Sequence, residues 1–380
     1  LDQMTVSITP YDVRQSGFTG GGVNAATKSG TNTYKGSVYS YLTNSHLKGS
    51  KVGDVNLPVT DSHNSTYGVT FGGPILKDKL FFFVNGEYED VVVAGRAVSA
   101  YNRSDQPYSA MNRRPKLAEL ESLSSYMQKA YGITTGPWQG YNIKTPAYRI
   151  LARIDWNIND DHKLNVRFTK SNRKESNPAS ASRSIGSNRT SIIYGGNQNS
   201  YGSNTDYSMS SLSSRYVTEF RFTSFAAELN SKFGKLHNTL RGTYSFQDQP
   251  RTNEYGESVP VVEIVMSDNP DPNAINPHYP SWALMGDMFT YQNVAQTKTT
   301  VITDELNIHL GKHNLFGGLQ YQHDYAANGY AQAGAGYYAF QATPEQVKAG
   351  DWASVFKPEN TRLFGITYGN GADHSPFVAK

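Results

Sequence analysis

The chain has no cysteine among its 380 residues, which excludes disulfides, thiol catalysis and cysteine-ligated metal sites. It also lacks long apolar runs, since the densest, Leu80 to Val84, falls far short of the roughly 18 residues that a membrane-spanning helix needs. Only 37% of the residues are hydrophobic, fewer than a helix-rich soluble enzyme usually carries. The net charge of +3 is too small to indicate a nucleic-acid partner. The composition does not exclude a protein that crosses the membrane with β-strands, because such a strand needs only about 9 to 11 residues with every second one apolar.

What is present is a strict alternation of apolar and polar residues, clearest where Ile150, Ile154 and Trp156 alternate with Arg153 and Asp155. Such alternation puts the two sets on opposite faces of a strand. A cation at the middle of a lipid-facing strand would cost roughly 2 to 4 kcal/mol, so the polar face must meet water. We expect the lumen-facing residues to include Glu87, Arg153, Asp155, Arg167, Glu228 and Arg241. We expect the lipid-facing residues to include Ile150, Ile154, Trp156, Phe168, Leu229 and Leu306.

The segments pair into hairpins with short turns near residues 74–79, 159–162, 234–235 and 311–312, while the other connections run to tens of residues. Repeated structureless connections of that length argue against a compact soluble domain. Outer-membrane barrels have short turns on one side and long loops on the other. The alternative is a soluble β-sandwich or barrel whose apolar faces pack on a core. Tyrosine-rich strand ends, which suit the aromatic girdles of membrane barrels, favour the membrane interpretation.

Two of the long connections carry helix signals. Leucine, methionine and tyrosine recur at helical spacing over 115–131, and Gly132 follows as a stop. Thr343 and Gln346 enclose Pro344 in a capping-box pattern. We expect both helices to fold back over the mouth of the barrel, and the Ser/Asn-rich stretch 171–214 to be a solvated loop.

The run YDVRQSGFTGGGVNA (11–25), continued by TKSGTN (27–32), resembles the end of the plug domain of TonB-dependent outer-membrane receptors. The resemblance is to the Oar-like subfamily, close to the SusC-like receptors. The runs FGGPILKDKLFFF (71–83) and LARIDWNIN (151–159) resemble the first barrel hairpins of the same family. The junction of plug and barrel would include Arg14, Gly20, Gly21, Gly22 and Asn24.

The resemblance implies an all-β fold, a transmembrane antiparallel β-barrel of about 22 strands closed by a plug. Residues 1–32 would end the plug, and 33–380 would form about nine strands of the N-terminal part of the barrel with long extracellular loops. Lipid tolerates no open sheet edge, so we expect a longer parent chain.

The resemblance also implies a function: import of a substrate bound at the extracellular loops, driven by a TonB complex acting through a segment outside this chain. Lipid and lipopolysaccharide of the bacterial outer membrane would surround the barrel. A surface lipoprotein is a possible further partner, and the resemblance does not identify the substrate. The alternative is a non-transporting outer-membrane scaffold, an adhesin or a component of a larger envelope or secretion assembly. We expect neither enzyme activity nor a cofactor.

Other candidate sites carry little. The glycines of 20–22 lack the Lys-Ser/Thr pair of a phosphate loop. His309 and His313 flank a turn but supply only two metal ligands. Glu87 and Glu89 share a strand face as a hydrolytic pair would, yet they also suit a charged lumen. Asp268, Asp271 and Asn273 could hold calcium loosely, but a plain acidic loop is the preferred interpretation. The basic tract Arg113 to Lys116 suits a solvated or lipopolysaccharide-facing patch better than a nucleic-acid site.

Overall fold

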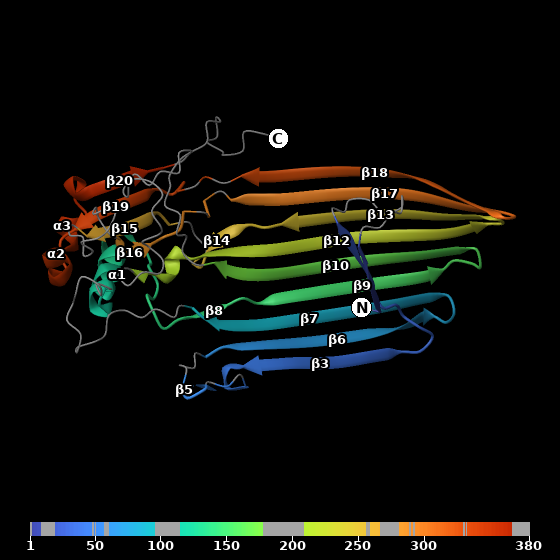
Figure 1. The fold of residues 1–380 in the computed structure, drawn as a ribbon, viewed down its shortest axis with the longest axis horizontal. Coiled ribbons are helices and arrows are strands. Elements are labelled where there is room, and N and C mark those ends of the chain that lie inside the picture. The colour runs from blue at the N-terminus through green and yellow to red at the C-terminus, as the bar shows by residue number, and fades with distance from the viewer. Residues whose placement is uncertain are drawn as a thin grey trace.

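The computed structural model is dominated by one antiparallel sheet of long strands, called here the long sheet (Figure 1). The structure describes residues 2–8, 20–47, 49, 51–56, 61–95, 115–177, 209–255, 259–266, 281–288, 290–291, 293–329, 331 and 333–366. Nine strands follow one another across the sheet in chain order: β3 (Lys35–Asn44), β6 (His63–Leu76), β7 (Leu80–Ala94), β9 (Ala147–Asn157), β10 (His162–Asn177), β12 (Tyr216–Phe233), β13 (Leu236–Asp248), β17 (Val294–Leu310) and β18 (His313–Gly329). Short strands β8 (Asn142–Lys144) and β14 (Arg251–Asn253) extend it.

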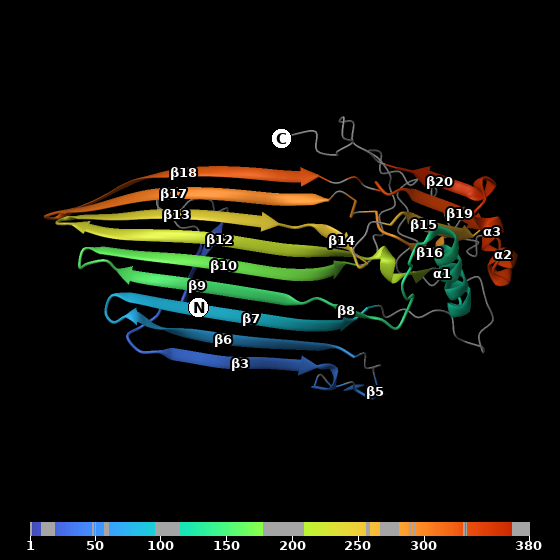
Figure 2. The same ribbon diagram turned by 180° about the vertical axis from the view of Figure 1, so that it is seen from behind.

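The tight turns that join β6 to β7, β9 to β10, β12 to β13 and β17 to β18 lie at one end of the long sheet (Figure 2). Gly234 and Gly311 adopt φ values of 64° and 61°, a left-handed conformation that glycine takes without strain. Asp78 takes φ 60° in the β6–β7 turn, as aspartate tolerates better than most residues. In the β9–β10 turn the Asn159 side-chain oxygen accepts hydrogen bonds from the backbone N–H groups of Asp161 and His162. The predicted short turns are therefore confirmed, each with its own local cause.

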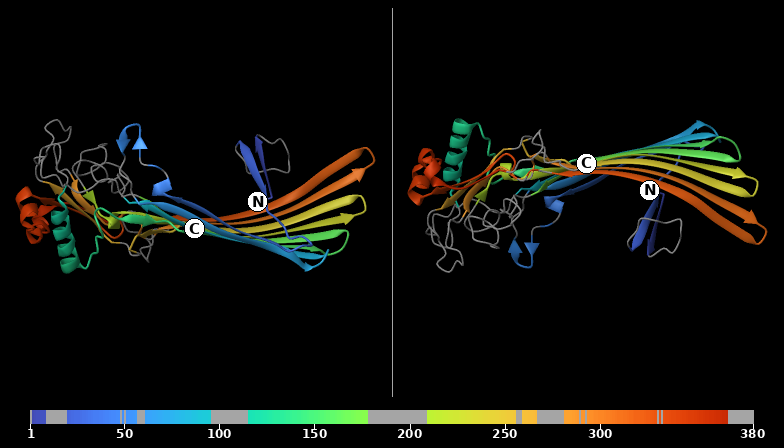
Figure 3. Two further views of the ribbon diagram at one scale, coloured as in Figure 1. Left: turned by 90° about the horizontal axis from the view of Figure 1, so that it is seen from below. Right: turned by 90° about the horizontal axis from the view of Figure 1, so that it is seen from above.

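The residues before β3 form a separate hairpin that stands off one side of the long sheet (Figure 3). Strand β1 (Gln3–Ile8) pairs antiparallel with β2 (Gly21–Ala26). After β3 come a short helix η1 (Ser45–Leu47) and the small pair β4 (Lys51–Val52) and β5 (Val55–Asn56).

The long connections build a compact unit at the other end, called here the cap (Figures 1 and 2). Its five-stranded sheet has the order β11 (Met209–Ser210), β16 (Ser281–Met285), β15 (Val261–Met266), β19 (Tyr337–Ala342) and β20 (Thr361–Gly365). The helical segments of these connections are α1 (Leu117–Tyr131), α2 (Pro344–Ala349), α3 (Trp352–Val355), η2 (Leu212–Ser214) and η3 (Pro358–Asn360). The cap sheet is mixed, because β15 runs parallel to β19 and antiparallel to β16.

The hydrophobic core lies in the cap and not against the long sheet. All six residues of β15 are buried, and one cluster joins that strand to Leu120 and Leu123 of α1 and to Trp352 of α3. On the long sheet, Ile150, Ile154 and Trp156 keep exposed fractions of 43%, 45% and 41%. No layer of the described residues covers them, so the structure contradicts the soluble-sandwich alternative.

The two helix predictions are confirmed in detail. Helix α1 ends at Gly132, which caps it with φ 69°. The Thr343 hydroxyl accepts a hydrogen bond from the Gln346 N–H, and the Gln346 side chain accepts one from the Thr343 N–H.

The expectation that the long connections are structureless is wrong. They assemble the cap sheet, because apolar segments from different connections bury one another there. The helices pack on that sheet and not across the long strands. The expected solvated loop 171–214 is wrong at both of its described ends. Strand β10 continues through 171–177, and 209–214 form β11 and η2 with Met209 and Ser211 fully buried. Residues 178–208 lie outside the described residues.

Candidate functional site

The register of the long sheet gathers the predicted residues onto two faces. Glu87, Arg153, Asp155, Arg167, Glu228 and Arg241 share one face, called here the polar face. Ile150, Ile154, Trp156, Phe168, Leu229 and Leu306 share the other, called here the apolar face. Strand pairing alone places the residues on these two faces, because residues directly opposite one another on paired strands point to the same side of the sheet.

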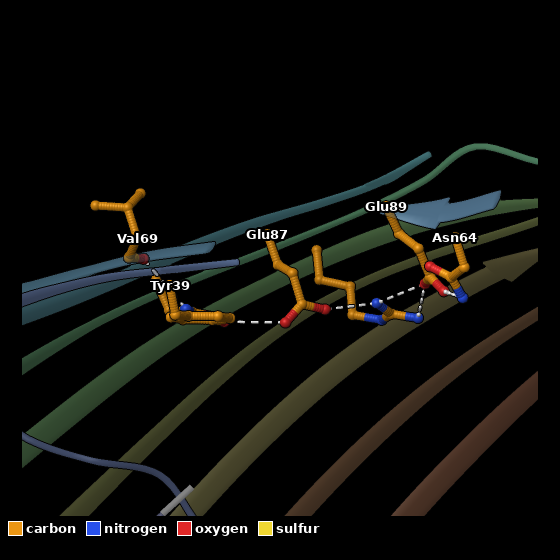
Figure 4. A network of polar contacts seen from close by, with 7 residues as sticks. Tyr39, Asn64, Val69, Glu87 and Glu89 are labelled. Carbon is orange, nitrogen blue, oxygen red and sulfur yellow. Dashed lines mark hydrogen bonds and ion pairs between the residues drawn. The ribbon is translucent and has the colours of Figure 1, made fainter. Parts of the chain in front are cut away.

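A network on the polar face joins four strands around Arg149 (Figure 4). The Arg149 guanidinium lies 2.6 Å from a Glu87 carboxylate oxygen and 3.2 Å from one of Glu89. The Tyr39 hydroxyl donates to Glu87 at 2.9 Å, and the Asn64 amide donates to Glu89 at 3.2 Å. Each carboxylate is thus held by a cation and a neutral donor, which leaves neither placed as a free acid or base.

A second network crosses the later strands. The Arg241 guanidinium bridges Glu228 and Glu305, each at 2.7 Å. Asn230 donates a further hydrogen bond to Glu228 at 2.8 Å. Arg167, on the same face, makes no ion pair with the described residues.

Arg153 connects the long sheet to the N-terminal part of the chain. Its guanidinium donates three hydrogen bonds of 2.7 to 3.0 Å to the Asp155 carboxylate. Its remaining amino group donates to the carbonyl oxygen of Thr27 at 2.9 Å and to the Thr27 hydroxyl at 3.0 Å. Because Asp155 fixes the guanidinium, little further side-chain entropy is lost when it binds Thr27.

A second anchor lies between Thr27 and β3. The Asn32 side-chain oxygen accepts from the Asp78 N–H at 2.8 Å, and its amide donates to the Asp78 carboxylate. The Tyr34 hydroxyl donates to the Pro74 carbonyl oxygen at 2.9 Å. Gly30 lies against β6 and β7 so closely that a Cβ would stand 2.9 Å from the Gly73 carbonyl oxygen. The segment 27–34 is therefore fixed to the turn end of the long sheet.

Most of the residues expected at the junction lie in or beside β2. Gly21, Gly22 and Asn24 pair with Ile8, Ser7 and Thr5 of β1, and a Cβ built on Gly20 or Gly22 would meet no atom within 4 Å. Arg14 lies outside the described residues.

The contacts with the long sheet come instead from Thr27, Gly30 and Asn32, which the sequence analysis did not single out. The Ser-Gly-Thr-Asn turn around them was recognisable from sequence, but its partner Asp78 is 46 residues away from Asn32. Arg149 and Glu305 were missed as well, since only the strand register brings them beside their acidic or basic partners.

The described residues offer no group of three or more histidine, aspartate or glutamate side chains placed to hold a metal. The His309 ring contacts His237, with centroids 5.8 Å apart. His313 pairs with Leu310 and His309 with Asn314, so the two turn histidines point to opposite faces. The tracts 268–273 and 113–114 lie outside the described residues. None of the described helices is long and apolar enough to cross a membrane.

The cap contains an open apolar cavity of about 300 Å³ between α1 and the cap sheet. Its lining is almost free of polar atoms and consists of Met127, Tyr131, Ile133, Pro260, Val262, Tyr338, Phe340 and Phe356. Phe356 stacks on Tyr126 at 5.5 Å and meets Phe340 edge-on at 4.8 Å. Partial burial and a hydrogen bond with Tyr126 raise the pKa of the Tyr131 phenol, which stays neutral at ordinary pH. Such a cavity suits a flat or branched apolar group.

The two-faced sheet, its exposed apolar face and its charged opposite face match a known domain. The family model described as an outer membrane beta barrel domain matches residues 26–102 and 138–357, which is more than half of the chain. This chain belongs to the outer-membrane β-barrel family. The barrel is an outer-membrane protein, and its apolar face is the kind of surface that such proteins turn toward lipid.

The chain is similar to a TonB-dependent transporter in sequence and to an outer membrane transporter and a siderophore receptor in structure. The TonB-dependent transporter Oar of Myxococcus xanthus is 41% identical over 71 residues, which cover 17% of this chain and 7% of the relative. The superposition on the outer membrane transporter YddB of Escherichia coli covers 90% of this chain and 37% of the YddB chain, with 11% sequence identity and a TM-score of 0.49. The superposition on the siderophore receptor PirA of Acinetobacter baumannii covers 80% of this chain and 32% of the PirA chain, with 14% sequence identity and a TM-score of 0.40. The match thus spans well under two thirds of each relative, and both TM-scores lie below 0.5.

Proposed function

We propose that the barrel is part of a TonB-dependent receptor that imports a substrate bound at its extracellular cap. Residues 1–32 would end the plug, and the polar face would line the lumen. The observation that carries this proposal is the contact of Arg153 with Thr27, because it holds the segment that leads to β1 and β2 against the polar face. A wide barrel must be obstructed to keep the membrane sealed, and a segment held against the polar face supports that role.

The charge pattern of the polar face supports this role. Arg149 pairs with Glu87 and Glu89, and Arg241 pairs with Glu228 and Glu305, so each group keeps one net negative charge on the polar face. We propose no catalytic role for the glutamates, since their oxygens already accept hydrogen bonds from fixed neighbours. The cap cavity, lined by Tyr131, Tyr338, Phe340 and Phe356, would contact the substrate. Lipid and lipopolysaccharide would surround the barrel, and TonB would act through a segment outside this chain.

The plug proposal is tested by the conductance of the full-length protein in planar lipid bilayers. The wild-type protein should pass no current until urea releases the plug. Arg153→Ala should begin to conduct at a lower urea concentration, because Thr27 loses both of its hydrogen bonds to the barrel wall. Arg173→Ala is the matched control, since Arg173 pairs with Glu175 and lies over the Phe220 ring on the sheet itself, and the Arg173 and Glu175 side chains are about half exposed. Equal urea thresholds for Arg153→Ala and wild type would contradict a plug held at this point.

The transport proposal is tested in cells. Growth on a peptide, glycan or metal chelate that requires this protein should be lost when TonB is deleted. A phenotype that needs the protein but not TonB would favour the second candidate, a scaffold, an adhesin or a component of an envelope assembly. The extended aromatic surface of the cap suits that role too.

A further inference from the structure

The apolar cavity of the cap is built by three of the long connections. Helix α1 supplies Met127 and Tyr131, β15 supplies Val262, and β19 supplies Tyr338 and Phe340. Met127 and Val262 also belong to the packed core of the cap, where their exposed fractions are 1% and 4%. The core therefore fixes the walls of the cavity, and a preformed cavity binds a ligand with little cost of ordering.

The lining of the cavity offers a ligand almost no polar atoms. The Tyr131 phenol already shares a hydrogen bond with Tyr126. A sugar or a charged metal chelate would lose water from its polar groups on entering and would gain no hydrogen bond in return. An apolar group instead displaces poorly ordered water, which favours binding. The glycan and the metal chelate considered above therefore fit this cavity less well than a substrate that carries an uncharged apolar group.

The walls also favour a flat group over an aliphatic one. The rings of Tyr338 and Phe340 lie parallel, with an interplanar angle of 4° and centroids 6.4 Å apart. Phe356 meets Phe340 edge-on at 4.8 Å, so the walls combine parallel and edge-on rings. A planar ring can make offset-stacked and edge-to-face contacts with such walls, which a branched aliphatic group cannot.

The volume of the cavity sets the size of that ring. A cavity of roughly 150 Å³ lined by apolar side chains accepts one benzene molecule. The cap cavity has about 300 Å³, which leaves room for two fused rings.

We propose that the cap cavity binds an uncharged aromatic group of about the size of indole, carried by the substrate. This inference rests on the proposed function, because it names the part of the substrate that the receptor recognises. The ring is held between α1 and β19, and the rest of the substrate extends through the open side of the cavity.

The test is binding of N-acetyltryptophanamide to the full-length protein in lipid nanodiscs, measured by calorimetry against empty nanodiscs. This probe is uncharged and carries one indole ring. It should bind once per chain, and N-acetylleucinamide should bind about fivefold more weakly, because the stacking contacts of one ring are worth roughly that factor. Maltose should not bind.

Three variants locate the bound ring. Phe340→Leu keeps an apolar wall but removes a ring, and it should weaken binding of the indole probe about fivefold. Ile133→Trp fills the cavity from its own lining and should abolish binding. Phe364→Leu is the matched control, because Phe364 lies beside Tyr338 on β20 but is 55% exposed and outside the lining, so the affinity should not change. An unaltered pattern of surface proteolysis shows that each cap is folded, and Phe340→Leu suffices if Ile133→Trp does not fold.

Three results would overturn the proposal. Equal affinities for the two amides would show that the cavity does not select a ring. Wild-type affinity in Phe340→Leu would place the probe elsewhere. No binding to the wild-type protein would show that the cavity is not accessible to such a group.

These measurements do not involve TonB, so they separate the two proposals. A missing signal from the probe together with TonB-dependent growth would contradict the ring site alone. A bound probe together with a phenotype that does not need TonB would contradict import and leave the ring site in place.

Discussion

At the scale of single residues, the segment entering the long sheet is constrained by close approach more than by hydrogen bonding alone. Gly30 passes over β6 and β7 where no side chain fits, and the Asn32 side-chain oxygen accepts a hydrogen bond from the Asp78 N–H in the β6–β7 turn. Gly22, only eight residues earlier, faces open space. The sequence makes these glycines look alike, and the structure separates them.

This difference predicts the outcome of matched substitutions. Gly30→Ala would force a Cβ against the carbonyl oxygens of Phe82 and Gly73 and should lower the free energy of unfolding by about 1 to 3 kcal/mol. Gly22→Ala should change it little, because nothing lies within 4 Å. Equilibrium unfolding in detergent measures both. Equal effects of the two alanines would show that 27–34 is not seated as described.

At the scale of elements, strand β9 shows how the apolar and polar faces are set. Ile150, Ile154 and Trp156 point one way, while Arg153 and Asp155 point the other together with one apolar residue, Leu151. That exception gives the strand an internal control, because Leu151 and Ile154 are close in sequence, similar in size and on opposite faces.

Arginine at these two positions should have unequal effects. Ile154→Arg puts a cation on the apolar face and should destabilise the membrane-inserted protein by roughly 2 to 4 kcal/mol. Leu151→Arg puts the same cation among the polar side chains of the other face and should cost much less. The amount of heat-modifiable protein recovered from outer membranes reports the difference. Comparable losses from both variants would contradict the assignment of the faces.

At the scale of the whole molecule, the long sheet and the cap are stabilised by different means. The cap has a packed core around β15, α1 and α3, whereas the long sheet relies on its strand hydrogen bonds and on an apolar face exposed in the described structure. Lipid contact, and not burial within the protein, would stabilise that face.

A core substitution in the cap should therefore leave the barrel strands intact. Leu120 is fully buried, and Leu120→Ala should destabilise the cap by about 2 to 5 kcal/mol. Limited proteolysis from the cell surface should then cleave the cap, while the long strands stay protected in the membrane. Glu121→Ala, at an exposed neighbouring position, is the control. Loss of the whole protein from the membrane in Leu120→Ala alone would show that cap and sheet fold as one unit.

The sequence alone determined the long sheet, its turns and its two faces, because a period of two residues, short glycine or aspartate turns and opposed polarity are local properties. It also located α1 and the Thr343 cap, whose signals lie within a few residues. Tertiary structure alone decided that the long connections assemble a cap sheet, that Arg153 holds Thr27 and that Asn32 meets Asp78. Each of these depends on strand register and long-range packing, which bring together residues that no local pattern relates.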